Sequence, residues 1–235
     1  SIMLVYPFIA GQKKLTSLLR VGSNSSSDQQ TVTLPLDIRE GDLIICANQA
    51  WNTSSTAAAP PSGFTSMMTW HLSAVLSGVT RYSRTCVSRK IAAGTEGGTT
   101  LTGMSLTGSV NPGAALGVVV FRGNKKITSV SAAQDFDGVG TTGGSAISRN
   151  VDAADGDEPM LVVSYVQNLG ATFSSVNQRL MTPSADDELV FGSNNMALRW
   201  LFYGANETPE DNLLSMQAWS GTRMLSNCYR SEEHT

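Results

Sequence analysis

The chain has 235 residues, of which 41% are hydrophobic, 7% aromatic and only 15% charged, with a formal net charge of −3 at pH 7. This charged fraction lies below the ~25% of an average soluble protein, and polarity comes instead from 51 serines and threonines and 22 glycines. The composition argues against a coiled coil or helical bundle, whose exposed faces need Glu, Lys and Arg. It also argues against a nucleic-acid-binding protein, because 16 Lys and Arg against 19 Asp and Glu leave no basic excess to neutralise phosphates.

The cysteines and the apolar start of the chain bear on whether the protein is secreted or inserted in a membrane. Cys46, Cys86 and Cys228 are widely spaced and form no C-x-x-C pair, so we expect no secreted disulfide framework. We interpret them as buried thiols that pack as small hydrophobes. The apolar segment Ile2–Ala10 is short, lacks a preceding basic region and contains Pro7, so we expect neither a signal peptide nor a membrane span.

Apolar segments along the chain are brief and β-branched, and Gly, Ser, Asn and Pro separate them, which is typical of strands. In chain order the predicted strands are Thr31–Leu36, Asp42–Ala50, Thr80–Ala92, Gly117–Arg122, Met160–Gln167, Leu189–Phe191, Ala197–Tyr203 and Leu214–Trp219. Leu116–Phe121 is apolar throughout, which predicts a central strand covered on both faces. Short helical turns at Lys13–Arg20 and Ala185–Val190 stay open.

The strand series predicts an all-β protein, an antiparallel β-sandwich of jelly-roll-like type. A Gly-Asp turn precedes Leu43–Ala50, which is followed later by Val120–Gly123, and a second Gly-Asp turn precedes Met160–Gln167, followed later by Trp200–Gly204. We interpret this echo as two pseudo-repeated halves that divide near the loop at 138–145. The predicted organisation is a single domain over residues 1–235 with an N-terminal arm at about 1–20. Two β-halves, 21–137 and 146–235, are the alternative.

Five short motifs follow one another in the first half of the chain. They are Gly41-Asp42-Leu43-Ile44-Ile45, Pro61-Ser62-Gly63-Phe64-Thr65, Arg89-Lys90-Ile91-Ala92, Thr99 with Leu101, and Val119-Val120-Phe121-Arg122-Gly123. In order and spacing they resemble a loosely defined group of tailed-bacteriophage virion proteins, namely tail-associated, fibre or capsid-decoration β-sandwich proteins. The resemblance covers residues 40–123 best. Phe64 stands where the group usually has Trp and Phe121 where it usually has Tyr, so the aromatic packing is kept without the polar hydrogen bond.

The resemblance implies a non-enzymatic structural component of a tailed-phage virion, a tail-associated or fibre protein that forms a homo-oligomer. A capsid decoration (cement) protein is one alternative, in which the apolar arm Ser1–Leu15 would add a strand to a neighbour. A carbohydrate-binding adhesin module is the other. The expected partners are other copies of the chain, other virion proteins and, for the adhesin, a host-surface glycan. Neither nucleic acid nor membrane insertion is expected.

Patterns that support cofactor binding or nucleophilic catalysis are weak. Gly138–Gly143 matches G-x-G-x-x-G, but no amphipathic helix follows it, so we expect no dinucleotide site. His71 and His234 are the two histidines, and they do not form a pair at metal-ligand spacing. We therefore expect no enzyme, no cofactor and no metal ligated by histidine.

Carboxylates gather in two loops. Asp152, Asp155 and Asp157 lie in one turn, and calcium favours several oxygens from a flexible loop, although the spacing does not fit an EF-hand. Asp135 and Asp137 could pair for glycoside hydrolysis, which depends on a carboxyl separation that a sequence does not supply. A solvated turn is the simpler interpretation, and whether the Asp152 loop binds an ion stays open.

Four residues are candidates for contact with a partner or a glycan. Trp51 directly follows a predicted strand and precedes a polar loop, as a stacking platform or interface anchor would, and a core position is the alternative. Trp70 is a second aromatic candidate. Alternation in the strand Thr80–Ala92 places Arg84 and Lys90 on one face, which would suit an acidic neighbouring subunit, with a solvated sandwich face as the alternative.

Overall fold

The computed structural model describes residues 18–27, 30–52, 58–76, 79–105, 114–123, 127–129, 134–137, 145–149, 159–168, 187–192, 195–204, 214–218 and 222–231. All regular structure in these ranges is β-strand, and every strand pair is antiparallel. The predicted all-β class is therefore confirmed, whereas the jelly-roll type stays a prediction. Within the same ranges there is no helix that could cross a membrane.

The first half of the chain forms one large sheet and one small sheet. Its strands are β1 (Leu19–Ser26), β2 (Thr31–Thr33), β3 (Glu40–Asn52), β4 (Thr65–Leu76), β5 (Val79–Ala93), β6 (Thr100–Thr102) and β7 (Ala115–Arg122). The large sheet has the order β1-β7-β3-β5-β4, and β2 pairs with β6 in a separate two-stranded sheet.

The second half repeats this plan. Its strands are β8 (Ile127–Ser129), β9 (Gln134–Asp137), β10 (Ser145–Arg149), β11 (Met160–Asn168), β12 (Asp187–Phe191), β13 (Met196–Tyr203), β14 (Leu214–Ala218) and β15 (Thr222–Ser231). The large sheet has the order β12-β13-β11-β15-β8, with β9 also pairing with β15, and β10 pairs with β14. If β8 and β9 together correspond to β1, then β10 to β15 correspond to β2 to β7, and the two halves share one topology.

The strand registers show which residues correspond. Leu43 lies opposite Phe121 in the β3–β7 pair, and Leu161 lies opposite Tyr229 in the β11–β15 pair. The Phe121 strand therefore corresponds to the Tyr229 strand, and not to Trp200–Gly204 as the sequence echo suggests. The halves also meet before Ile127, earlier than the loop at 138–145, because β8 and β9 both pair with β15.

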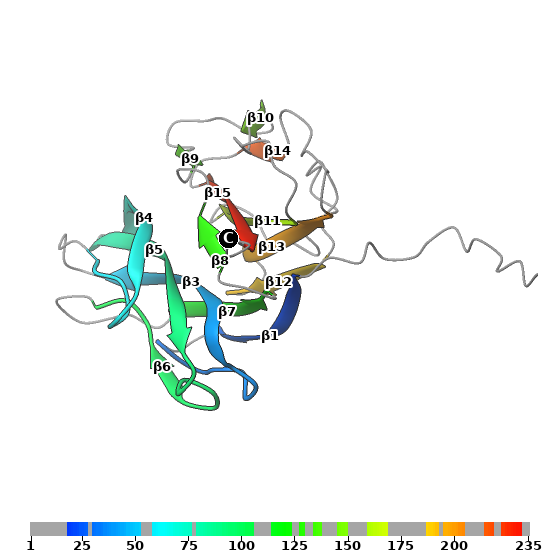
Figure 1. Ribbon diagram of the computed structural model, residues 1–235. Coiled ribbons are helices and arrows are strands. Elements are labelled where there is room, and N and C mark those ends of the chain that lie inside the picture. The colour runs from blue at the N-terminus through cyan, green and yellow to red at the C-terminus, as the bar shows by residue number, and fades with distance from the viewer. Residues whose placement is uncertain are drawn as a thin grey trace, which may run out of the picture.

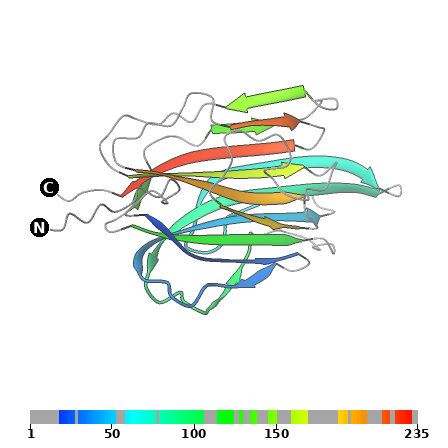
Figure 2. The ribbon, with the colours of Figure 1, turned by 90° about the vertical axis from the view of Figure 1, so that its right-hand side faces the viewer.

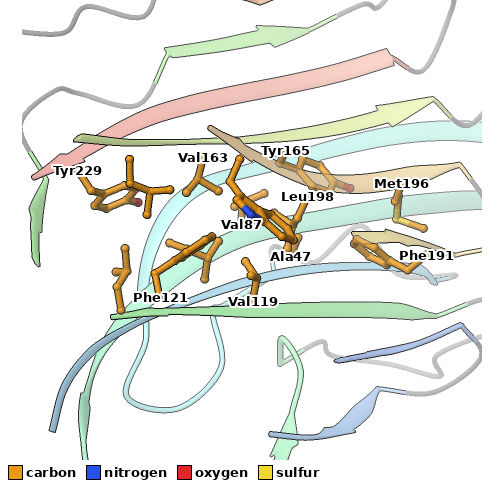
Figure 3. Close-up of a cluster of buried hydrophobic side chains, with 14 of the residues drawn as sticks. Ala47, Val87, Val119, Phe121, Val163, Tyr165, Phe191, Met196, Leu198 and Tyr229 are labelled. Atoms are coloured by element: carbon orange, nitrogen blue, oxygen red, sulfur yellow. The ribbon is translucent and has the colours of Figure 1, made fainter. Parts of the chain in front are cut away.

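The sheets stack in four layers (Figure 1, Figure 2), with the two large sheets face to face and the two-stranded sheets on the outer sides. The central core contains side chains from both halves (Figure 3), including Val119 and Phe121 from β7 and Val163, Leu198 and Tyr229 from the second sheet. Full burial of a side chain of this kind is worth about 1.5–3 kcal/mol. The two halves therefore stabilise each other through one shared core.

Strand β7 is covered on both faces, as its unbroken apolar sequence predicts. Val119 and Phe121 face the central core, whereas Val118 and Val120 belong to a second cluster that includes Val32 of β2. All of these side chains are buried. The helical turn that stayed open at Ala185–Val190 is wrong for its described part, because β12 pairs with β13 along its whole length.

Candidate functional site

The first sheet is longer than the second at one end of the sandwich, and Figure 2 shows β4 and β5 running past the other strands. The Thr85 hydroxyl of β5 donates to Oε1 of Gln167 at 2.7 Å, next to the last residue of β11. Beyond this contact β5 reaches back to Val79 and β4 runs on to Leu76. We call this part of the first sheet the overhang; it comprises residues 51–52, 71–76 and 79–84.

A buried polar cluster lies where the overhang joins the sandwich. Oε1 of Gln167 accepts hydrogen bonds from Thr85 Oγ1 at 2.7 Å and from the Tyr165 hydroxyl at 2.8 Å, and Nε2 of Gln49 donates to Oγ of Ser83 at 2.9 Å. All five side chains are buried. Buried polar groups that are hydrogen-bonded to one another hold a single arrangement, so the cluster fixes how the overhang leaves the core.

Trp70 lies in the core and is not available as a stacking platform. Its side chain is 7% exposed, and its ring stacks on Tyr165 with centroids 6.0 Å apart and planes 21° apart. Strand alternation explains this position, because it places Trp70 on the same face of β4 as Met68, which also packs against the central core. The prediction of a surface contact at Trp70 is therefore wrong in this structure.

Trp51 has the position that a contact residue needs. It is the second-last residue of β3 and lies opposite Ser83. It is half-buried and shares its face of the strand with Gln49 and Ala47 by alternation. An aromatic ring that is fixed on one side and open on the other can stack on a sugar or anchor a partner. Trp51 therefore remains the candidate contact residue of the overhang.

Arg84 and Lys90 do not form an open basic face. Arg84 is 5% exposed, with its guanidinium carbon 5.5 Å from the centroid of the Tyr82 ring. Nζ of Lys90 lies 2.7 Å from Oε1 of Glu96, and the Lys90 side chain is 28% exposed. One cation is thus covered and the other is neutralised, so the prediction that they dock together on an acidic subunit is not supported by their positions.

Glu96 locks the turn after β5. Its carboxylate oxygens accept the amide N–H of Ala93 at 3.0 and 3.1 Å and that of Thr95 at 3.0 Å. Burial alone would raise the pKa of Glu96, but the Ala93 amide and the Lys90 ammonium outweigh it and lower this pKa to about 2. The carboxylate therefore stays charged and holds its partners over the whole neutral range.

A second ion-pair site joins two of the five motifs that carry the resemblance. Arg122 donates from Nε to Oδ1 of Asp42 at 2.8 Å and from Nη2 to Oδ2 at 2.7 Å. Nη2 also donates to the backbone oxygen of Asp37 at 2.6 Å, and Nη1 donates to its carboxylate at 3.2 Å. The hydrogen bonds that Arg122 donates to Asp42 raise the pKa of Arg122, and those that it donates to Asp37 hold the pKa of Asp37 below its usual range.

Sequence reasoning places Asp42 and Arg122 at strand ends but misses their pairing. The signal that could have found it is register, because Leu43 opposite Phe121 makes the preceding Asp42 and the following Arg122 neighbours. The Asp42 side chain is 2% exposed, and Arg122 is its ion-pair partner. Met160 and Arg230 occupy the corresponding positions in the second half.

Cys46 and Cys86 are free and buried, as predicted, and the side chain of Cys228 is not described. Burial raises the pKa of both thiols, that of Cys86 to about 11. In the register Cys46 lies opposite Ser88 and Cys86 opposite Asn48. The two are therefore diagonal neighbours, a separation of about 7–8 Å that a disulfide does not bridge.

Several predicted features lie outside the described residues, namely Gly138–Gly143, Asp152, Asp155, Asp157 and His234. His71 lies in β4, and Asp135 and Asp137 lie in β9. In the part of the chain that the structure describes, no group of three or more His, Cys, Asp or Glu residues could hold a metal ion.

Comparison of the chain with protein-family models, with curated proteins and with solved structures found no match.

Proposed function

We propose that this protein is a non-enzymatic structural component of a tailed-bacteriophage virion, a tail-associated or fibre protein that assembles as a homo-oligomer. The observation that supports it most is the ion pair between Asp42 and Arg122. It gives two separate motifs of the phage-like pattern one shared structural role, since it ties the loop at Asp37 to the ends of β3 and β7.

The charges of the molecule also suit an assembly component. Only 15% of the residues are charged, and several of these are already engaged, as in the pairs Lys90–Glu96 and Arg20–Asp187. Interface cores are depleted in charged residues, because free charges must be desolvated on docking. A surface whose polar groups are mainly hydroxyls loses less solvation free energy when it docks against a neighbouring subunit.

The test is to locate the chain in particles. In washed, gradient-purified particles we expect the chain in a copy number set by the symmetry of the tail, and gold-labelled antibody should mark the tail in electron micrographs. Labelling of the shell would favour the decoration alternative. Absence of the chain from such particles, with known tail proteins detected by the same mass spectrometry as a control, would contradict the proposal.

A second candidate function is glycan binding, and the position of Trp51 favours it. This half-buried ring lies opposite Ser83 in the β3–β5 pair and offers a stacking surface to a sugar. Trp51→Ala should weaken binding on a glycan array about tenfold, whereas Trp51→Phe should retain most of it. Equal binding by both variants would remove Trp51 as the contact.

A further inference from the structure

The β4–β5 hairpin is longer than its counterpart in the second half. Gln49, Thr85 and Trp70 form one row across the first sheet. Counting along the registers from the Leu43 and Leu161 pairs, the corresponding row of the second sheet is Gln167, Met196 and Phe191.

The second half turns directly after this row, through a turn in which the Asn195 amide donates to the Gly192 oxygen at 3.3 Å. The first half continues for six more residue pairs, from His71 opposite Arg84 to Leu76 opposite Val79. At about 3.3 Å per residue, the extension is ~20 Å long.

Comparison with the second half shows whether the fold needs this extension. It builds the same strand order and the same outer two-stranded sheet without the six additional pairs. Among the side chains that the structure describes, the last members of the central core along these strands are Trp70 in β4 and Phe191 in β12. The extension is therefore not needed for the fold.

After its bulge at Ser66, the outer edge of β4 has neither the charged residues nor the prolines that usually protect an edge against strand pairing. Among the described residues β4 pairs only with β5, and its twelve residues include no Asp, Glu, Lys, Arg or Pro. Thr65, Ser66 and Thr69 are exposed. Natural proteins shorten or charge such edges because an open edge pairs with another strand.

The corresponding edge strand of the second half is protected. β12 has five residues and starts with Asp187 and Glu188, and Nε of Arg20 lies 3.7 Å from the Asp187 carboxylate. The edge at β4 is therefore long and uncharged, as in a strand that is open to pairing, whereas the equivalent edge at β12 is short and charged, as in a strand that is protected from it.

We propose that β4 pairs with β4 of a second copy of this chain, joining two five-stranded sheets into one. This inference rests on the homo-oligomer of the proposed function and names its contact. In an antiparallel pairing centred on Leu72, Met68 lies opposite Leu76 and Trp70 opposite Ala74, so apolar positions meet apolar positions on one face.

The absence of acidic and of Lys or Arg residues in β4 favours a second copy as the occupant. Pairing of two identical strands would place every charge of β4 twice in the same interface, and like charges near each other across a strand pair destabilise it. The nine positions from Met68 to Leu76, which follow a bulge in the register after Ser66, supply on the order of ten backbone hydrogen bonds, as in a typical interface.

The test is sedimentation equilibrium of the full chain and of two matched variants. Thr69→Lys places a charge on the exposed face of the pairing segment and should shift the dimer to monomer. Thr65→Lys makes the same change at an exposed residue of the same strand before the bulge, and should dimerise as the unmodified chain does.

Cross-linking tests the register. Leu72→Cys should form a disulfide-linked dimer under mild oxidation, because the two positions face each other across the two-fold axis, whereas Ser66→Cys should not. Circular dichroism confirms that each variant is folded.

Each other outcome overturns the inference in a distinguishable way. A dimer that Thr69→Lys leaves intact would place the interface elsewhere while preserving the proposed homo-oligomer. A monomeric chain whose Thr69→Lys variant is lost from purified particles would make the partner a different protein. A monomeric chain absent from particles would refute both the inference and the proposed function.

Discussion

At the scale of single residues, ion pairs in the first half hold separate segments of the chain together. The buried carboxylate of Asp42 is held by both arms of the Arg122 guanidinium and also accepts the amide N–H of Arg39 at 2.8 Å. Removing one partner of a buried ion pair leaves an uncompensated charge, which costs far more than the net contribution of the pair.

Arg122→Ala should therefore lower the free energy of unfolding by about 3–5 kcal/mol, measured by chemical denaturation. Arg122→Lys should recover only part of this loss, because an ammonium group cannot bind both carboxylate oxygens in the same plane. Arg39→Ala, which removes an exposed guanidinium beside Asp37, is the control and should cost little. Equal losses of unfolding free energy for Arg122→Ala and Arg39→Ala would contradict this role of the Asp42–Arg122 ion pair.

The depressed pKa of Glu96 predicts acid sensitivity. Since its pKa falls from the usual 4.5 to about 2 on folding, its contribution is complete above about pH 5 and disappears as the pH falls toward 2. Glu96→Gln should cost about 2–3 kcal/mol at pH 7, and this difference from the unmodified chain should shrink toward pH 2.

The measurement is the unfolding free energy at intervals between pH 7 and pH 2. Lys90→Gln should show an intermediate pH dependence, because the hydrogen bonds from Ala93 and Thr95 remain. Parallel curves for the unmodified chain and Glu96→Gln would rule out this role of the carboxylate.

At the scale of elements, the close approach of β7 and β12 depends on one glycine. A Cβ on Gly117 would lie 2.6 Å from Cε1 and 2.8 Å from Cζ of Phe191, too close for either ring atom to stay in place. Gly117 thus admits the Phe191 ring into the core (Figure 3).

Gly117→Ala should lower the unfolding free energy by about 1–3 kcal/mol through overpacking, although replacing a strand glycine by alanine ordinarily gains about 0.5–1 kcal/mol. Combining it with Phe191→Leu should recover part of the loss, since leucine leaves room for the methyl group. Thermal denaturation of the single and double variants gives the coupling energy. A neutral Gly117→Ala would show that the ring moves aside freely.

The sequence predicts those elements whose residues also prefer to be strands. All eight predicted strands are observed, because their β-branched residues and their burial favour the same structure. The other seven strands are missed, namely β1, β4, β6, β8, β9, β10 and β15. β1 reads Leu-Arg-Val-Gly-Ser-Asn-Ser-Ser, a composition with weak strand preference, and it is a strand because β7 offers its backbone groups as partners.

The candidate site is less predictable than the fold, because whether a side chain is exposed depends on the partner sheet. Trp51 and Trp70 look alike in sequence, yet Trp70 is buried against Tyr165 whereas Trp51 is half-buried. Arg84 and Lys90 share a strand, but a neighbouring ring and a turn carboxylate decide their surroundings.

At the scale of the whole molecule, the two halves have one core between them. Leu43 and Val119 of the first sheet belong to the same buried cluster as Leu161 and Leu198 of the second. Neither sheet can lose the other without exposing its apolar face to water, so the halves should unfold together.

Unfolding should therefore be a single cooperative transition. Leu43→Ala and Leu198→Ala should each cost about 2–5 kcal/mol, and each should destabilise both sheets equally. Native-state hydrogen exchange of the β3 and β11 amides is the measurement. If each variant lowered the protection of amides from exchange only in its own half, the result would contradict the shared core.

The division of strands between the halves has a consequence for synthesis. Every strand of the first sheet has been synthesised once the chain reaches Arg122, but the strands that cover its apolar face are made later, from Ile127 to Ser231. At ~5–20 residues per second, the nascent first half waits roughly 5–20 s with Leu43, Val119 and Phe121 uncovered. During this interval an identical nascent chain on the same messenger RNA offers a matching apolar face. When many ribosomes translate one messenger RNA, we therefore expect neighbouring chains to associate through their first sheets. When one ribosome translates it alone, we expect the second sheet to cover the first sheet of its own chain.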